Sequence, residues 1–185
     1  MHSVLYLAVV SAFVCALVVL AYRSGRTQKS RASVSWEDLI ARLDRVNSAG
    51  VAGVAREFLN PTGQQVDPRN DGKRMEPSDI WDMVGGIQGI EVMRQNTAVL
   101  IEIAAYIQRW NPEAVIVAEQ LRLDAHEMEG YLKRLKASDR AGTLQTWFPF
   151  YAQRAVSAYY LMTRRVLALC EISHAGLLPS LQAAL

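Results

Sequence analysis

Few residues in this 185-residue chain have the types and spacings that metal chemistry requires. Glu171 and His174 have the Glu-x-x-His spacing of di-iron sites in helical bundles, where two such motifs and two further glutamates converge. Only one copy is present, and it lies near the end of an expected helix. A solvated helix terminus is therefore the favoured interpretation of this pair.

Four further candidate ligands lie close together in the middle of the chain: Asp124, His126, Glu127 and Glu129. Asp124 and Glu127 are three residues apart and share one side of a helix, whereas His126 projects elsewhere. A charged, exposed helix face accounts for this pattern without a metal ion. The same patterns leave a helical metalloenzyme only as the least favoured alternative.

Residues 67–72 superficially resemble a calcium-binding loop. The third position of that loop is Arg69, and its twelfth is Ser78, where a bidentate glutamate is required. Gly85, Gly86 and Gly89 do not follow a strand, so they are not a dinucleotide-binding fingerprint. We expect these glycines to allow close helix packing or a kink. No nucleophile motif is present either, so the sequence predicts no catalytic residue, no metal ligand and no cofactor.

The segment 140–165 contains four arginines, no acidic residue and six aromatic residues. Core packing with a basic edge is the favoured interpretation, because the segment is also needed to close a bundle. Contact with a membrane or a protein partner is the alternative, and nucleic-acid binding is the least favoured one. The residues assigned to a possible interaction surface are Arg154, Arg164 and Arg165.

Residues 3–22 are predicted to form a single transmembrane helix in contact with the lipid bilayer. The chain carries no charge from Val4 to Tyr22, and about 20 apolar residues cross a hydrocarbon core of about 30 Å. A cleaved signal peptide is disfavoured because no Lys or Arg precedes the apolar run and no small-x-small site follows it.

The charges beside this segment predict its orientation. Four basic residues and no acid follow it: Arg23, Arg26, Lys29 and Arg31. The other 16 Lys and Arg residues are balanced by 18 Asp and Glu residues, which argues against a nucleic-acid surface. Because basic residues stay on the cytoplasmic side, we expect the N-terminus outside and the rest of the chain at the inner face of a bacterial cell membrane.

The remaining sequence indicates an all-α fold without strands. Helices are expected from 35 to 46, 51 to 59, 78 to 110, 112 to 136 and 144 to 173, and residues 60–77 form a loop. One helix carries apolar residues at heptad spacing: Val115, Ala118, Leu121, Ala125, Met128, Leu132 and Leu135. The predicted organisation is an anchor (1–22), a basic tether (23–34), an antiparallel three- to four-helix bundle (35–176) and a fraying tail (177–185).

These features favour a non-enzymatic protein that binds another protein, or a second copy of itself, at the cytoplasmic membrane face. The heptad residues suit self-association as well as packing within the chain. A small-ligand sensor is the alternative, with an expected pocket near Gly85, Gly86 and Trp147.

Overall fold

The computed structural model describes residues 34–59 and 75–185, and its described helices run from α2, which begins at Trp36, to α8, which ends at Ala184. Four predictions lie outside the described residues: the membrane segment 3–22, its basic flank (Arg23, Arg26, Lys29 and Arg31), nearly all of the tether, and most of the loop 60–77. Among the described helices, none is both long and apolar enough to cross a membrane.

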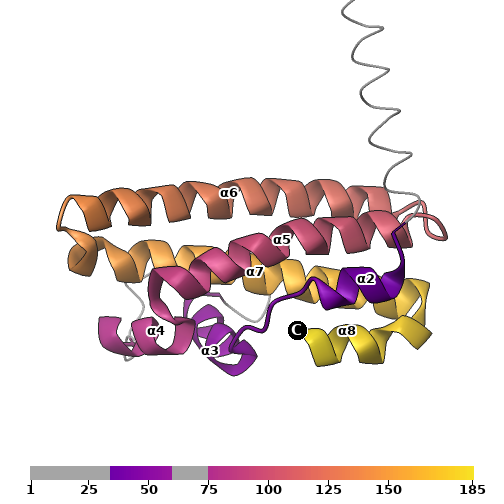
Figure 1. The fold of residues 1–185 in the computed structure, drawn as a ribbon, viewed down its shortest axis with the longest axis horizontal. Helices are drawn as coiled ribbons and strands as arrows, with labels where there is room; N and C mark the ends of the chain where they lie inside the picture. Colours follow the sequence, from indigo (N-terminus) through magenta and orange to yellow (C-terminus); the bar gives the residue numbers. More distant parts are fainter. Residues whose placement is uncertain (1–33, 60–74) are drawn as a thin grey trace, which may run out of the picture. The chain divides into compact units, whose positions relative to one another are not determined.

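Three long helices form the body of this fold. They are α5 (Gly86–Ile107), α6 (Ala114–Arg140) and α7 (Leu144–Ser173), and each packs against the other two in alternating directions (Figure 1). The all-α bundle predicted from the sequence is confirmed. Most of the heptad residues of α6 are buried in it: Ala118, Leu121, Met128, Leu132 and Leu135. These residues therefore pack within the chain.

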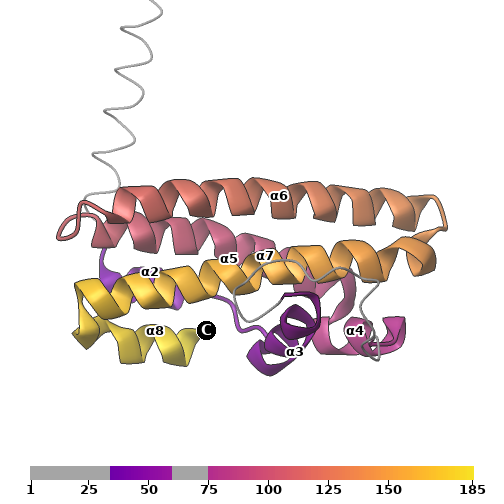
Figure 2. The ribbon, with the colours of Figure 1, turned by 180° about the vertical axis from the view of Figure 1, so that it is seen from behind.

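Short helices cover the side of the bundle that faces away from α6 (Figures 1 and 2). They are α2 (Trp36–Ala41), α3 (Ser48–Phe58), α4 (Pro77–Val84), the 3-10 turn η1 (Ala175–Leu177) and α8 (Leu178–Ala184). α2 contacts α5 and α8, whereas α3 and α4 contact each other and α7. Because every one of these short helices lies away from α6, the outer side of α6 has no described helix over it.

Glycine divides the single helix expected from 78 to 110 into α4 and α5. Gly85 and Gly86 have φ angles of 75° and 62°, a left-handed conformation that other residues rarely adopt. A Cβ on Gly86 would lie 2.7 Å from the Trp81 ring, and one on Gly89 would lie 1.7 Å from the carbonyl oxygen of Val84. The expected kink is thus a full helix break, and its glycines lie against neighbouring atoms.

The C-terminal tail was expected to fray, and this prediction is wrong for the residues of α8. Leu181 is fully buried, and Trp36 Nε1 donates a hydrogen bond of 2.9 Å to Ser180 Oγ. Pro179 lies in the first turn of α8, where its missing N–H group costs nothing. The proline that suggested disorder instead begins a docked helix.

Asn96 on α5 fixes the chain between α2 and α3. Its side chain is buried, accepts a hydrogen bond from Asp44 N at 2.9 Å and donates one to Asp44 O at 2.8 Å. Its amide nitrogen also lies 3.2 Å from Tyr159 Oη on α7. One buried amide therefore satisfies both backbone groups of Asp44 and links them to two long helices.

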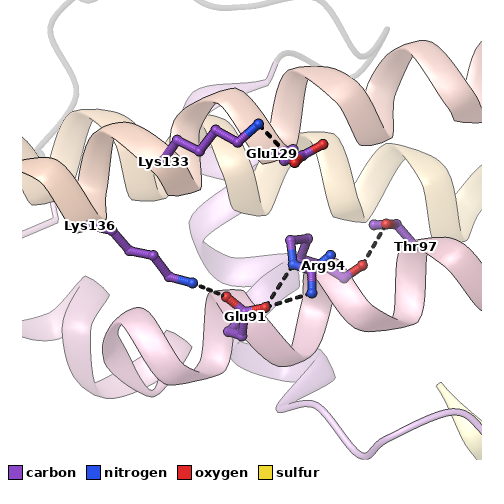
Figure 3. A network of polar contacts seen from close by, with 6 residues as sticks. All are labelled: Glu91, Arg94, Thr97, Glu129, Lys133 and Lys136. Carbon is purple, nitrogen blue, oxygen red and sulfur yellow. Dashed lines mark hydrogen bonds and ion pairs between the residues drawn. The ribbon is translucent and has the colours of Figure 1, made fainter.

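An exposed polar network joins α5 to α6 (Figure 3). Glu91, which interrupts the apolar pattern of α5, lies 2.5 Å from Lys136 Nζ and 2.7 Å from Arg94. The hydrogen bond from Lys136 is the main reason that the pKa of Glu91 falls below its usual value. On α6 itself, Lys133 pairs with Glu129 at 2.9 Å.

Candidate functional site

An aromatic–arginine cluster lies where α7 begins, and we define it as Phe58, Tyr131, Trp147, Phe150, Tyr151 and Arg154. Four of its members lie at positions 147, 150, 151 and 154 of α7, a spacing that places them on one side of the helix. Phe58 comes from the end of α3 and Tyr131 from α6. The cluster thus forms only after three helices have packed together.

Arg154 is at the centre of this cluster. Its guanidinium carbon lies 4.4 Å from the centre of the Phe150 ring, and 5.9 and 6.0 Å from those of Phe58 and Tyr131. Such cation–π contacts contribute about 0.5–2 kcal/mol each, depending on how far they are removed from water. Aromatic faces therefore hold this charge in place, and among the described ion pairs none involves Arg154.

The polar groups around Arg154 are incompletely partnered. One guanidinium nitrogen lies 3.5 Å from Tyr131 Oη, which in turn donates to Glu127 at 2.5 Å. Burial, with the Glu127 carboxylate, raises the pKa of Tyr131 above its usual value. Among the described residues, Arg154 Nε has no hydrogen-bond partner although it is buried, and the same holds for Oε2 of Glu57, one residue before Phe58.

Two aromatic side chains of the cluster are exposed to solvent. Trp147 is 46% exposed and stacks on Tyr151 at 5.9 Å, and Phe150 is 45% exposed and meets Tyr151 edge-on at 5.2 Å. Arg134 of α6 lies 5.7 Å from the Tyr151 ring on the same side. Large exposed aromatic rings beside arginine are enriched at the centres of protein–protein interfaces.

Arg164 and Arg165, predicted with Arg154 as one surface, lie in different surroundings from it and from each other. Arg165 forms an ion pair with Asp124 of α6, while Arg164 is exposed on α7 beside α3 and α8. Ten residues of helix, or about 15 Å, separate Arg154 from Arg164. The three arginines therefore do not form one cluster.

Asp124 was expected on an exposed charged face, but it is buried. It accepts a hydrogen bond of 3.1 Å from Gln120 and pairs with Arg165. Burial nevertheless raises the pKa of Asp124, and it outweighs the opposing effects of Gln120 and Arg165. The carboxylate is thus occupied within the fold.

The groups that suggested a metal site do not converge. Glu171 and His174 are both exposed, and the His174 ring lies 5.7 Å from that of Trp110. Glu127 accepts a hydrogen bond from Tyr131, and Glu129 forms an ion pair with Lys133. Among the described residues, no three His, Cys, Asp or Glu side chains are placed to hold a metal ion.

A shallow groove of about 220 Å³ lies between α3, α7 and α8, away from the glycines and Trp147 where a pocket was expected. Tyr160, Thr163 and Arg164 line it, together with Leu185 at the end of the chain. Ligand pockets usually enclose about 300–1,000 Å³. The groove is smaller than this, so it favours a ligand-binding role less than the cluster favours a protein partner.

The sequence identified the α7 part of the cluster but missed Phe58, Tyr131 and Glu57. These residues come from other helices, and no local pattern indicates which aromatic will meet Arg154. Comparison with protein families, with curated proteins and with solved structures finds no match to this chain. The chemistry of the cluster is therefore the best indication of what the protein binds.

Proposed function

We propose that this protein is a non-enzymatic, membrane-anchored interaction module whose helical bundle binds a protein partner through the aromatic–arginine cluster. The observation that carries the proposal is the combination of exposed Trp147 and Phe150 with a central Arg154, which lies against aromatic rings and joins no ion pair among the described residues. The guanidinium nitrogens of Arg154 other than Nε retain donor capacity for an acceptor on a partner, since one of them makes only a 3.5 Å contact with Tyr131 Oη.

The partner surface has a definite chemistry on this account. Apolar side chains cover the rings of Trp147 and Phe150, and a carboxylate or carbonyl oxygen accepts a hydrogen bond from Arg154. Removal of two large rings from water supplies most of the affinity. The charge-assisted hydrogen bond supplies orientation.

The N-terminal segment supplies the location. Residues 3–22 span the cell membrane, and the basic flank Arg23, Arg26, Lys29 and Arg31 keeps the bundle on the cytoplasmic side. The support for this part is the uncharged apolar run and the one-sided charge. In a carbonate wash of membranes the full chain stays in the pellet, and protease digests the bundle only in inverted vesicles. Release by carbonate, or digestion in right-side-out vesicles, contradicts it.

The partner site is tested by photo-crosslinking of the full chain in its host membrane. A photoreactive phenylalanine analogue at Phe150 is expected to give a discrete adduct. The same analogue at Ile172, which is 81% exposed near the other end of α7, is the matched control and gives no such adduct.

A second variant tests the role of the charge. Arg154→Met preserves the length and apolar stem of the side chain but removes the guanidinium, so we expect the Phe150 adduct to disappear. An adduct that persists in this variant, or that also forms from position 172, contradicts the proposed binding site.

A further inference from the structure

The outer side of α6 carries a second apolar line at heptad spacing, distinct from the buried one. We call it the outer stripe, and it consists of Ile116, Leu123, Gly130 and Ala137. All four residues are exposed, and the two large ones are 74% and 66% exposed. Helix positions seven residues apart lie almost directly above one another. The stripe therefore forms a continuous line along α6, and the described short helices lie on the opposite side of the bundle from α6 (Figures 1 and 2).

The outer stripe has large residues in one half and small residues in the other. Ile116 and Leu123 occupy the N-terminal half, whereas Gly130 and Ala137 occupy the C-terminal half. Apart from the backbone of α6 itself, no atom of the described residues lies within 4 Å of a Cβ built on Gly130, so this position offers space to an approaching side chain. Small residues at a helix surface allow a second helix to come close.

The charges beside the stripe are also divided between the two halves. Glu113, Glu119 and Arg122 lie toward the N-terminal end, and Glu127, Lys133, Arg134 and Arg140 lie toward the C-terminal end; all are exposed. The first group is net acidic, with Arg122 paired to Glu119, and the second is net basic. A second α6 in the parallel direction would bring like charges together. In the antiparallel direction it brings the acidic half of each helix against the basic half of the other.

From this complementarity we infer that the outer stripe of α6 pairs with the α6 of a second copy of this chain, antiparallel and across a two-fold axis near Leu123. In that register the two Leu123 side chains meet, and each Ile116 lies over Gly130 of the other copy. The arrangement is isologous, so it closes as a dimer and leaves no free end.

The flanking charges favour this register over neighbouring ones. A two-fold axis across antiparallel helices brings the same flank of each helix together. On one flank Glu113 then faces Arg134 and Gln120 faces Glu127, and on the other Glu119 faces His126. A shift by half a heptad repeat, with the axis between Leu123 and Gly130, would instead place Glu127 against its own copy. The proposed register avoids that repulsion.

This pairing is independent of the aromatic–arginine cluster. The test uses the full chain in its membrane at native expression. Two differently tagged copies are co-expressed, one with Ile116→Cys and the other with Gly130→Cys. Because a disulfide needs Cα atoms about 4.4–6.8 Å apart, mild oxidation is expected to join the two tags. The chain without these substitutions, which retains Cys15 and Cys170, reports the background.

The orientation is read from the same experiment. A 116–116 disulfide in place of the 116–130 disulfide indicates a parallel pair and overturns the proposal. The absence of both disulfides also overturns it.

Leu123→Arg is expected to weaken self-association at least about tenfold, because a buried leucine is replaced by a charge at the axis. Ile172→Arg, an equally exposed change on α7, is the control and leaves it unchanged.

A charge exchange provides a second, self-controlled test. Glu113→Arg is expected to lower the yield of the 116–130 disulfide. Addition of Arg134→Glu is expected to restore that yield, because the ion pair is re-formed with its signs reversed. If restoration fails, the proposed register is wrong. If Leu123→Arg instead reduces binding to vesicles of anionic lipid without changing the disulfide, the stripe contacts the membrane and not a second copy.

Discussion

At the end of the bundle where α5 terminates, Trp36 is 5% exposed, lies 5.7 Å from the Tyr106 ring and donates to Ser180. Where α7 begins, Trp147 is 46% exposed and stacks on Tyr151. We call these the closed end and the open end. The same residue type is buried in one place and exposed in the other, although Trp110, at the same end as Trp36, is itself 50% exposed. Residue type alone therefore does not decide which tryptophan stabilises the fold.

Buried polar groups also differ between the half of the bundle nearer the closed end, which we call the closed half, and the half nearer the open end. In the closed half the charged pair Asp124–Arg165 is complete, and Asn111 Nδ2 donates to Ser173 Oγ at 2.8 Å. On α3 and α7, by contrast, Arg154 Nε, Glu57 Oε2 and Ser157 Oγ are buried and have no hydrogen-bond partner among the described residues. Such atoms are rare in folded proteins, so they set this part of the bundle apart from the part around Asp124.

The largest expected effect comes from the two tryptophans. Trp36→Ala removes a buried ring and the hydrogen bond that docks α8, so we expect a loss of about 3–5 kcal/mol in the free energy of unfolding. Trp147→Ala is the matched change at the open end, and its cost should be below about 1 kcal/mol. Urea unfolding followed by circular dichroism measures both. Equal losses would mean that the two ends do not differ as described.

An intermediate effect is expected from Asp124, and it concerns pH. Since burial raises the pKa of Asp124 above its ordinary value of 3.8, the folded chain holds this proton more tightly than the unfolded chain. The contribution of Asp124 to stability is therefore full below pH 3.8 and is lost as the pH rises through the higher pKa of the folded state.

Asp124→Asn removes this titration while retaining the shape of the side chain. The difference in unfolding free energy between the two chains should therefore change with pH in that window and be constant well above it. Glu91→Gln serves as the opposite control, because the pKa of Glu91 is lowered and its contribution is lost as the pH falls. If the stability difference for Asp124→Asn changes with pH in the same direction as that for Glu91→Gln, the pairing with Arg165, and not burial, dominates the pKa of Asp124.

The sequence predicted the long helices well because each has an apolar period and a clear stop. α7 occupies the expected range, with Pro149 tolerated in its early turns. α6 continues beyond the expected end at Lys136 to Arg140, since the breaking residue is Gly142 with a φ angle of 69°. α8 was missed because seven residues are too few to show a period. Its stability comes from the burial of its own Leu181 and from the hydrogen bond that Trp36 of α2 donates to Ser180.

The cluster could be predicted only in part. The aromatic residues of α7 are visible in the sequence, but their contacts with Phe58 and Tyr131 depend on how three helices pack. Asp124 shows the same limit, since a charged residue among charged neighbours gives no sign that it turns inward to Arg165. Periodicity predicts which face of a helix is apolar, and not which polar residue crosses to a particular partner.

The smallest effect, and the one most specific to an open surface, is expected from glycine. Gly130 lies within α6 with free space around its Cα, so Gly130→Ala should stabilise the chain by about 0.5–1 kcal/mol through reduced entropy of the unfolded state. Unfolding is measured in the Leu123→Arg background, so that self-association does not contribute. Gly89→Ala is the same substitution where a Cβ would lie 1.7 Å from the carbonyl oxygen of Val84, and it must destabilise. If Gly130→Ala also destabilises, the outer side of α6 is covered in the folded chain. The outer stripe is then a packed surface, like the buried heptad residues on the inner side of α6.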